Sequence, residues 1–197
     1  MIVYEDLLNS IKEVIGPDLL DSTIDRDELT IEVETTSIVR VLTILRDHSA
    51  FMFNLLLDIC GVDYPNNPKR FKVVYHLLSL EHNHRLRIKV STDGIQPVPS
   101  VIPVYSCANW YERETWDMYG IPFQDHPDIR RLLTDYDFEG HPMRKDFPLT
   151  GYVEVRYDLE FKKVIYEPVS LAQDFRNFDF LSPWEGMLQP PSTKKVS

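Results

Sequence analysis

The chain contains little cysteine and little glycine, and each shortage excludes a class of site. Its 197 residues include two cysteines, Cys60 and Cys107, which stand far apart, with no CxxC pair and no histidine at metal-ligand spacing. An iron–sulfur cluster normally takes four protein ligands, so this chain alone is not expected to hold one, and both thiols are expected to be reduced. The seven glycines are scattered and match no GxGxxG or GxxxxGK pattern, so no nucleotide-binding loop is predicted.

Long apolar runs and an excess of positive charge are also missing. No run of about 18 apolar residues occurs, so no membrane-spanning helix is predicted. The chain has 21 basic and 31 acidic side chains, and a net charge of −10 opposes non-specific binding to nucleic acid or anionic lipid. The N-terminal residues have an acidic flank and a helical apolar period rather than the features of a signal or transit peptide. This pattern is typical of a bacterial or organelle-encoded protein.

Hydrophobic periodicity predicts an α+β domain over residues 1–91. Apolar residues at helical spacing predict a helix over residues 4–15 and a second helix that starts after a cap at Thr36 or Ser37. Alternation and short apolar runs predict five strands, at residues 19–24, 29–33, 51–60, 71–80 and 85–90. The resulting order, αββαβββ, is typical of a two-layer α+β sandwich with a mixed sheet.

The last of these strands places Arg85, Arg87 and Lys89 on one face. That face is interpreted as a solvated sheet face, and contact with an acidic partner is the alternative. His82 and His84 in the preceding turn could form a metal-binding pair, but no third ligand lies near them in the sequence.

The second half of the chain is predicted to be an extended docking segment with short helices and a hairpin. Three prolines make residues 92–108 a connector. Residues 109–168 are expected to contain a helix of about ten residues that starts with a capping box at Asn109, a shorter helix from Pro127 through Leu133, and a hairpin of residues 152–157 and 163–167. Residues 169–197 are expected to form an extended tail that binds a partner.

Charged residues are crowded on the first of these helices. Glu112, Arg113, Glu114 and Asp117 lie within one and a half turns and beside two tryptophans. An exposed pair at i,i+4 contributes only about 0.3 kcal/mol, so pairing within the helix explains little. Two interpretations stay open, namely a solvated helix and a helix whose ions pair across a subunit boundary.

A second group of acidic residues resembles a calcium-binding loop. Asp135, Asp137, Glu139 and Asp146 follow that spacing, but Pro142 lies inside the loop and no exit helix follows. A metal-dependent enzyme that uses Asp135, Asp137 and Glu139 together with His141 is kept as an alternative. His126 and His141 each precede a proline, with no nucleophile or oxyanion loop nearby, and are expected to be structural hydrogen-bonding residues.

The C-terminal tail is rich in aromatic residues within a segment that has little helical or strand pattern. Phe175, Phe178, Phe180 and Trp184 together can bury roughly 600 to 1,000 Å², which is close to the share of about 800 Å² that one partner contributes to a standard interface. The tail is therefore expected to lie along its own domain or along another subunit.

Several segments together carry a resemblance to one known family. It is most specific at Glu112-Arg113-Glu114, Asp117, His126, Arg130 and Leu132-Leu133, it continues through the segments 135–136, 140–142, 144–149 and 151–158, and it includes the earlier segment 58–64 and the later segment 175–184. These segments resemble the respiratory-chain NADH dehydrogenase 30 kDa subunit family, also called the C subunit of NADH:quinone oxidoreductase (complex I), over nearly the whole chain. Two positions depart from the expected pattern, because Asp137 stands where glycine is expected and Met143 where leucine is expected.

The resemblance implies a non-catalytic subunit without a cofactor of its own. FMN, the iron–sulfur clusters and quinone would be bound by partner subunits, and this chain would dock on the 49 kDa-type (D) subunit and the cluster-bearing quinone-module (B) subunit. It would lie on the cytoplasmic side of the bacterial inner membrane, or on the matrix side of the mitochondrial one. A subunit of a membrane-bound hydrogenase or of a ferredoxin-dependent relative is the alternative.

The resemblance and the residue chemistry together give a set of expected docking side chains. They are Glu112, Arg113, Glu114, Asp117, His126, Arg130, Arg131, His141, Arg144, Lys145, Asp146, Glu154, Arg156, Phe175, Phe178, Phe180 and Trp184.

Overall fold

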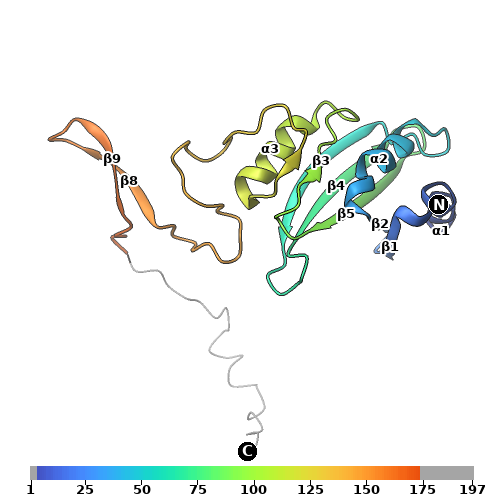
Figure 1. The fold of residues 1–197 in the computed structure, drawn as a ribbon, viewed down its shortest axis with the longest axis horizontal. Coiled ribbons are helices and arrows are strands. Elements are labelled where there is room, and N and C mark those ends of the chain that lie inside the picture. The colour runs from blue at the N-terminus through green and yellow to red at the C-terminus, as the bar shows by residue number, and fades with distance from the viewer. Residues whose placement is uncertain (1–3, 174–197) are drawn as a thin grey trace, which may run out of the picture. The chain divides into compact units, whose positions relative to one another are not determined.

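The computed structural model describes residues 4–173. The chain divides into two compact units, Met1–Leu149 and Thr150–Ser197 (Figure 1). The tail aromatics Phe175, Phe178, Phe180 and Trp184 lie outside the described residues, so their docking role stays a prediction.

The first unit is built on a sheet of five strands in the order β1-β2-β5-β4-β3. β2 and β5 are parallel and the other neighbours are antiparallel, which confirms the predicted mixed sheet. The elements are α1 (Tyr4–Ile15), β1 (Leu19–Asp25), β2 (Glu28–Val33), α2 (Ile38–Asp47), β3 (Leu55–Asp63), β4 (Phe71–Ser79), β5 (His84–Thr92), β6 (Val98–Pro99), α3 (Ala108–Tyr119) and β7 (Phe123–Gln124), with 3-10 turns at Gly16–Asp18 and Thr35–Ser37. The α+β class and the order αββαβββ are therefore confirmed.

The third predicted strand starts later than its apolar run indicated. Residues 51–54 form a turn after α2, in which the Phe53 N–H donates to the Leu45 carbonyl and Met52 adopts a positive φ of 46°. Phe51 and Phe53 are fully buried in this turn. The first residues of the apolar run thus form the buried turn after α2, and only the residues from Leu55 onward belong to β3.

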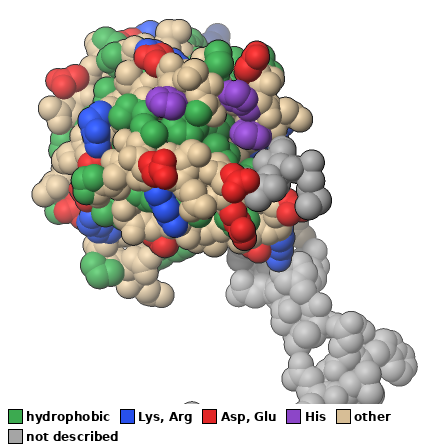
Figure 2. Space-filling model, turned by 90° about the vertical axis from the view of Figure 1, so that its right-hand side faces the viewer, with side chains coloured by type: hydrophobic (Ala, Val, Ile, Leu, Met, Phe, Trp, Pro, Cys, Tyr) green, Lys and Arg blue, Asp and Glu red, His purple; other side chains and the backbone are tan. Residues whose placement is uncertain are grey.

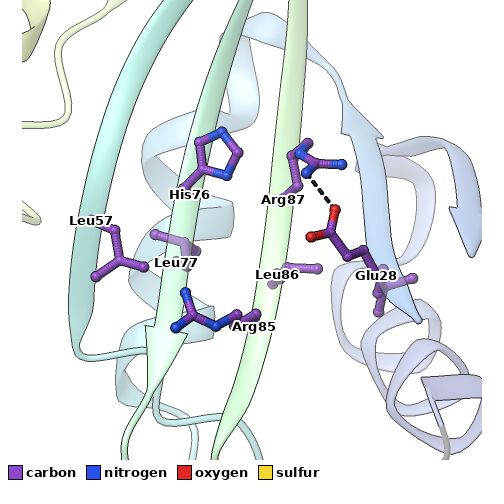
Figure 3. A pocket seen from close by; sticks show the side chains of 8 residues that line it. Glu28, Leu57, His76, Leu77, Arg85, Leu86 and Arg87 are labelled. Carbon is purple, nitrogen blue, oxygen red and sulfur yellow. Dashed lines mark hydrogen bonds and ion pairs between the residues drawn. The ribbon is translucent and has the colours of Figure 1, made fainter. Parts of the chain in front are cut away.

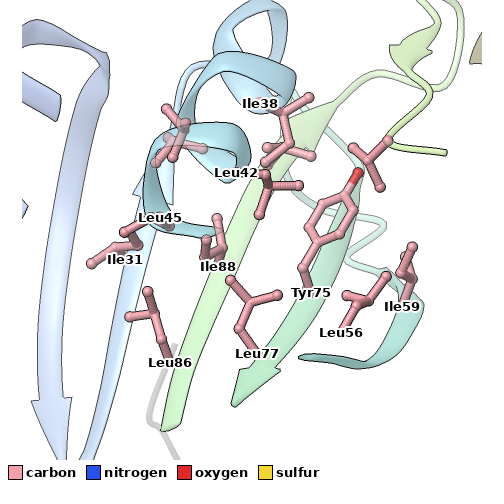
Figure 4. Close-up of a cluster of buried hydrophobic side chains, with 14 of the residues drawn as sticks. Ile31, Ile38, Leu42, Leu45, Leu56, Ile59, Tyr75, Leu77, Leu86 and Ile88 are labelled. Atoms are coloured by element: carbon pink, nitrogen blue, oxygen red, sulfur yellow. The ribbon is translucent and has the colours of Figure 1, made fainter. Parts of the chain in front are cut away.

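Apolar side chains from one face of the sheet and from α1 and α2 form the core. Figure 4 shows Leu77 and Ile88 pointing from β4 and β5 toward Leu42 of α2. The buried residues of α1 are Leu7, Ile11 and Ile15, which repeat every four positions and so form one face of the helix.

α3 covers the free edge of β3, which is an outer strand of the sheet (Figure 1). The Tyr111 hydroxyl donates to the Leu57 carbonyl at 3.0 Å, and the Thr115 hydroxyl donates to the Ile59 carbonyl at 3.4 Å. Tyr111 and Thr115 are four residues apart and therefore lie on the same side of the helix. Their hydroxyl groups bind edge carbonyls that would otherwise be open to another strand.

Tyr119 continues this side of α3 and leaves no room for a side chain at position 61. A β-carbon added to Gly61 would lie 2.5 Å from the Tyr119 ring. We expect Gly61→Ala to lower the free energy of unfolding by about 1–3 kcal/mol, because a packed core resists overfilling. Chemical denaturation measures this change. In the Tyr119→Ala background the same substitution is expected to be neutral, and equal effects in both backgrounds would show that the ring does not limit the site.

The segment of residues 92–108 is part of the first unit and does not end a domain. Val98 pairs with Phe123 in the short parallel sheet of β6 and β7, and Val101 and Tyr105 are buried in the core. The Tyr105 hydroxyl also donates to the Phe53 carbonyl at 2.6 Å. The compact unit therefore continues past the domain end expected at residue 91, because this proline-rich segment supplies apolar side chains to the core.

Two predictions about local helices are corrected. α3 begins at Ala108, with Cys107 as its N-cap residue and no side-chain cap, so Asn109 does not start a capping box. Residues 127–133 form no helix. The backbone N–H groups of Leu132 and Leu133 instead donate to the side chain of Asp117 on α3, so they are not available for helical hydrogen bonds.

The described part of the second unit is a hairpin of β8 (Val153–Asp158) and β9 (Lys163–Pro168), which pair antiparallel. The register places Val155 opposite Tyr166 and Tyr157 opposite Val164. The alternation of the sequence therefore predicted this element correctly.

Candidate functional site

The densest set of predicted site residues lies on α3 and on an irregular segment after β7, residues 125–149. We call this segment the belt. It contains no helix or strand, and it belongs to the first compact unit. Its backbone is held by polar side chains of α3 and of the β3–β4 hairpin, as the following contacts show.

Asp117 is the main anchor of the belt. Its Oδ2 accepts hydrogen bonds from the backbone N–H groups of Leu132, Leu133 and Thr134 at 2.8–3.1 Å. Its Oδ1 accepts from Arg131 Nη1 at 2.9 Å and from the Thr134 hydroxyl at 2.6 Å. Burial by itself would raise the pKa of this fully buried carboxyl, but these donors hold its pKa well below the usual range.

Arg131 and His141 tie the middle of the belt to the same place. Arg131 donates to the carbonyls of Phe138 and Gly140 at 2.7 and 3.0 Å, and its guanidinium lies 5.6 Å from the Trp116 ring centroid. His141 Nδ1 lies 2.9 Å from the Asp117 carbonyl, which can only accept, so this nitrogen carries the proton. Burial lowers the pKa of His141, and the ring is therefore a neutral structural donor.

The last part of the belt is fixed to the turn of the β3–β4 hairpin. Arg70 joins two carboxylates, since it donates to Asp63 at 2.7 Å and to Asp146 at 2.9–3.0 Å. Asp63 also accepts from the Lys145 backbone N–H at 2.7 Å. Arg144 Nε donates to the Tyr119 carbonyl at 2.6 Å. The belt is thereby attached near its middle and again near its end.

Glu112 holds a different segment, the loop that follows β6. Its carboxylate is fully buried and accepts from the Ser100 hydroxyl and the Val101 N–H, both at 2.7 Å. Burial is the largest effect and raises the pKa of Glu112 to about 7, against the two hydrogen bonds, which lower it. His126 Nε2 lies 3.9 Å from this carboxylate and 3.1 Å from the Asn109 carbonyl.

The protonation of His126 follows from its two contacts. Its Nδ1 accepts from the Asp128 N–H at 3.0 Å, so Nε2 carries the proton and donates to Asn109. His126 is thus a structural hydrogen-bonding residue, as the sequence indicated.

Arg113 is buried with few partners. Its guanidinium lies 5.3 Å from the Trp110 ring centroid and 3.8 Å from Asp128, and its Nε has no hydrogen-bond partner among the described residues. Trp110 itself is 63% exposed. Trp110 therefore exposes its indole ring next to the guanidinium of Arg113, and tryptophan and arginine are both frequent at protein interfaces.

The structure gives most of the predicted docking side chains an internal partner. Glu114 and Lys145 are exposed, and Arg130 is exposed but pairs with Asp128 at 3.0 Å. The other side chains engaged inside the first unit are those of Glu112, Arg113, Asp117, His126, Arg131, His141, Arg144 and Asp146. The open question about the ions of α3 is therefore answered in part, because Glu112 and Asp117 are neither solvated nor unpaired. Contact of any of these residues with a partner stays a prediction.

The belt also exposes large apolar side chains that the sequence analysis missed. Leu133, Tyr136, Met143 and Leu149 are 62%, 77%, 53% and 85% exposed. Their only signal in the sequence was an apolar residue within a polar segment, which does not distinguish an outward side chain from a buried one. The backbone beneath them is fixed by the anchors described above.

The hairpin has one apolar face and one charged face. Val153, Val155, Tyr157, Val164 and Tyr166 share a face, and each is between 54% and 57% exposed. On the opposite face Arg156 pairs with Glu167 at 2.9 Å and with Asp158 at 3.6 Å, and Glu154 accepts from the Ser170 N–H at 3.2 Å. Most charges of this face have a partner within the hairpin, whereas the apolar face is bare within the described part of its unit.

The proposed metal sites are not assembled in this structure. Within residues 4–173, no three His, Cys, Asp or Glu side chains are grouped closely enough to hold a metal ion, so Asp135, Asp137 and Glu139 do not converge. Figure 2 shows histidine side chains beside hydrophobic ones on one face of the molecule. His82 and His84 stack with centroids 5.8 Å apart, and His82 Nε2 lies 3.1 Å from the Ser49 carbonyl. In the same residues no helix is long and apolar enough to cross a bilayer.

Comparison with known proteins identifies the family of the chain. The family model for the respiratory-chain NADH dehydrogenase, 30 Kd subunit, matches residues 31–153, which include most of the sheet, α3 and the belt. The chain belongs to this family. The match ends at the first residue of β8, so most of the hairpin lies beyond it.

Bacterial members of the family are similar over nearly the whole chain. The C subunit of NADH-quinone oxidoreductase from Paramagnetospirillum magneticum is 57% identical over 194 residues, which cover 98% of each chain. The protein of the same name from Methylorubrum extorquens is 62% identical over 186 residues, 92% of this chain and 85% of that one. Among solved structures, a chain of the membrane-bound sulfane sulfur reductase, an archaeal respiratory membrane complex, is 27% identical with a TM-score of 0.63, over 74% of this chain and 86% of that one.

Proposed function

We propose that this chain is a non-catalytic subunit of NADH-quinone oxidoreductase, complex I, and that it holds neighbouring subunits of the peripheral arm together. One observation carries the proposal, namely that buried polar anchors fix an irregular belt whose large apolar side chains point outward. Family membership and the names of the similar bacterial proteins support assignment to this complex.

The belt is suited to docking because it is ordered before any partner binds. Ordering a loop on binding costs affinity, and a segment fixed in advance avoids that cost. The five hydrogen bonds to the Asp117 carboxylate and the Arg70 bridge fix the belt at two separate places. Leu133, Tyr136, Met143 and Leu149 are then presented at set positions. This arrangement favours a binding role over a catalytic one.

The hairpin supports the same role from the second unit. A two-stranded hairpin is at best marginally stable by itself in water, and this one carries a bare apolar face. The face offers roughly 500 Å² of apolar surface, since a half-exposed tyrosine contributes about 100 Å². That is less than the share of about 800 Å² that one partner gives to a standard interface, so the hairpin is suited to be one part of a larger contact.

The redox chemistry belongs, in this proposal, to other chains. FMN, the iron–sulfur clusters and quinone are assigned to partner subunits, because two separated cysteines and scattered glycines provide no cluster or nucleotide site in this chain. We assign the contacts to the 49 kDa-type (D) subunit and the cluster-bearing (B) subunit, on the cytoplasmic side of the bacterial inner membrane, with attachment to the membrane through these neighbours. The likeness to a chain of another respiratory complex supports a structural role that does not depend on one electron donor.

The apolar face of the hairpin provides the test. The double variant Tyr157→Ser/Tyr166→Ser is expected to reduce incorporation of the chain into the complex by roughly tenfold or more, because it removes the two aromatic anchors of that face. Quantitative mass spectrometry of the complex purified from cells that carry the variant in place of the natural gene measures incorporation. NADH:quinone turnover in the membranes should fall in proportion.

Lys163→Ser is the matched control, because Lys163 lies on the opposite, charged face of the same hairpin. It is expected to incorporate normally. Full incorporation of the double tyrosine variant, or turnover by the isolated chain without the other subunits, would rule out the proposed role.

A further inference from the structure

One face of the five-stranded sheet is not covered by any helix of the described residues. α1 and α2 pack on the other face, and α3 lies along the β3 edge. In Figure 3 the uncovered face is turned toward the viewer, with His76, Arg85 and Arg87 on it and the helix behind the sheet. The basic residues of β5 thus lie on the open face, as the alternation of the sequence predicted.

This face contains a small pocket. The pocket has a volume of about 80 Å³, and its polar lining comes from Glu28, His76, Arg85 and Arg87. Figure 3 shows Arg85 reaching from β5 across β4 toward Leu57. The guanidinium of Arg85 therefore lies over the sheet, and the residue is exposed to solvent there.

The charges around the pocket are only partly paired. Arg87 forms an ion pair with Glu28, and on the same face Lys72 pairs with Glu32 at 2.7 Å. Arg85 has no hydrogen bond or ion pair with any residue that the structure describes. Lys89 likewise has no ion pair there and acts on Glu32 only at longer range. In a chain of net charge −10, this face keeps unneutralised positive charge.

The size of the pocket decides what class of group it can receive. Sites for cofactors and drug-sized ligands have volumes of about 300–1,000 Å³, so 80 Å³ is too small for them. A water molecule takes about 30 Å³ of liquid volume, so the pocket has room for a group such as a carboxylate with its methylene. Beside it Leu55 and Leu57 are 39% and 38% exposed, and they offer contact to an aliphatic segment.

We propose that this uncovered sheet face is a second docking surface, on which a neighbouring subunit of the assembly inserts an aspartate or glutamate side chain into the pocket and pairs it with Arg85. The proposal rests on the subunit role described above, because it takes another polypeptide of the complex as the occupant. Charge complementarity selects an acidic side chain, and the small volume selects a side chain rather than a free ligand. Asp58, which acts on His76 of the same face, opposes the incoming carboxylate at longer range, and direct contact with Arg85 outweighs it.

Two measurements on the whole complex test this proposal. In the first, a photo-reactive amino acid replaces Leu57 in the chain assembled in cells, and the cross-linked peptides are identified by mass spectrometry. The expected result is a cross-link to a peptide of another subunit that contains an acidic residue. Cross-links to phospholipid, or none to any subunit while the same probe at Tyr136 of the belt reacts with one, would overturn the proposal and leave the belt as a docking surface.

In the second measurement, Arg85→Glu is compared with Lys69→Glu, which makes the same charge change at an exposed lysine outside the pocket. We expect Arg85→Glu to lower retention of the chain in the purified complex by roughly tenfold or more at about 0.15 M salt, and Lys69→Glu to leave it unchanged. Replacing the cross-linked acidic residue of the partner by lysine should restore retention. Equal retention of both variants would refute the role of Arg85, whatever the hairpin variants show.

Discussion

Asp117→Ala is expected to lower the free energy of unfolding of the first unit by about 3–5 kcal/mol, which is the largest loss of stability that we predict for a single substitution. The change removes a fully buried carboxylate that accepts from the backbone of residues 132–134, from the Thr134 hydroxyl and from Arg131. All of these donors would lose their acceptor at once. Urea denaturation followed by tryptophan fluorescence measures the loss, since Trp116 lies next to Arg131.

Asp135→Ala is the matched control for this prediction. Asp135 is an exposed carboxylate on the same belt, and its removal is expected to change stability by no more than about 0.5 kcal/mol. The loss of stability in Asp117→Asn should lie between those of the two alanine variants. The amide keeps one oxygen for the backbone donors but places its N–H groups against the other donors, Arg131 and the Thr134 hydroxyl. An Asp117→Ala variant as stable as the control would show that the belt is held by other contacts.

The pKa of Asp117 also determines how its contribution to the free energy of unfolding changes with pH. The native pKa lies well below the ordinary value, so the stabilisation is present above the ordinary pKa and is lost as the pH falls toward the native one. The belt is therefore expected to loosen in acid.

Glu112→Gln is expected to remove a contribution to stability that falls as the pH rises, whereas the contribution of Asp117 rises with pH. The pKa of Glu112 is about 7 in the folded protein against an ordinary value of 4.5, so the folded state binds an extra proton between these two values. Stability from this group is full below about pH 4.5 and is lost as the pH rises to about 7, which amounts to roughly 3 kcal/mol. Glutamine keeps an acceptor for the Val101 N–H and has no charge to bury.

The measurement is the difference in unfolding free energy between Glu112→Gln and the natural protein at several pH values. We expect the unfolding free energy of the variant, relative to that of the natural protein, to rise by roughly 3 kcal/mol between about pH 4.5 and pH 8. Other titrating groups, such as His141, are present in both proteins and largely cancel in the difference. Parallel stability curves would mean that the carboxylate is already charged at about pH 5.

The sequence predicted the regular part of the fold because that part follows a simple period. The helices at residues 4–15 and after Ser37, the strands and the hairpin each have an apolar face of their own. The helix expected at residues 127–133 failed for a reason that no local pattern contains. The acceptor for its N–H groups is Asp117, which is fifteen to seventeen residues away from the donors.

The docking role of the predicted site residues stays a prediction, but the structure shows that many of them have contacts within the chain that were not expected. Glu112 and Asp117 were expected to be either solvated or paired across a subunit boundary, and the structure places their partners within the same chain. A sequence shows that such charges need partners but not which donors the fold brings to them. The outward side chains of Leu133 and Tyr136 were missed for the same reason, because their exposure is set by the belt backbone.

The tyrosine and threonine hydroxyls that α3 places along β3 have a consequence for the life of the subunit before assembly. Before it is assembled, a newly made chain exposes the apolar surfaces that its partners would cover. An unpaired edge strand would in addition allow copies to pair with one another and form fibrils. Because Tyr111 and Thr115 already bind carbonyls on that edge, β1 is the margin of the five-stranded sheet that is left for such growth. Unassembled copies of this protein therefore have one sheet edge, rather than two, through which they can join.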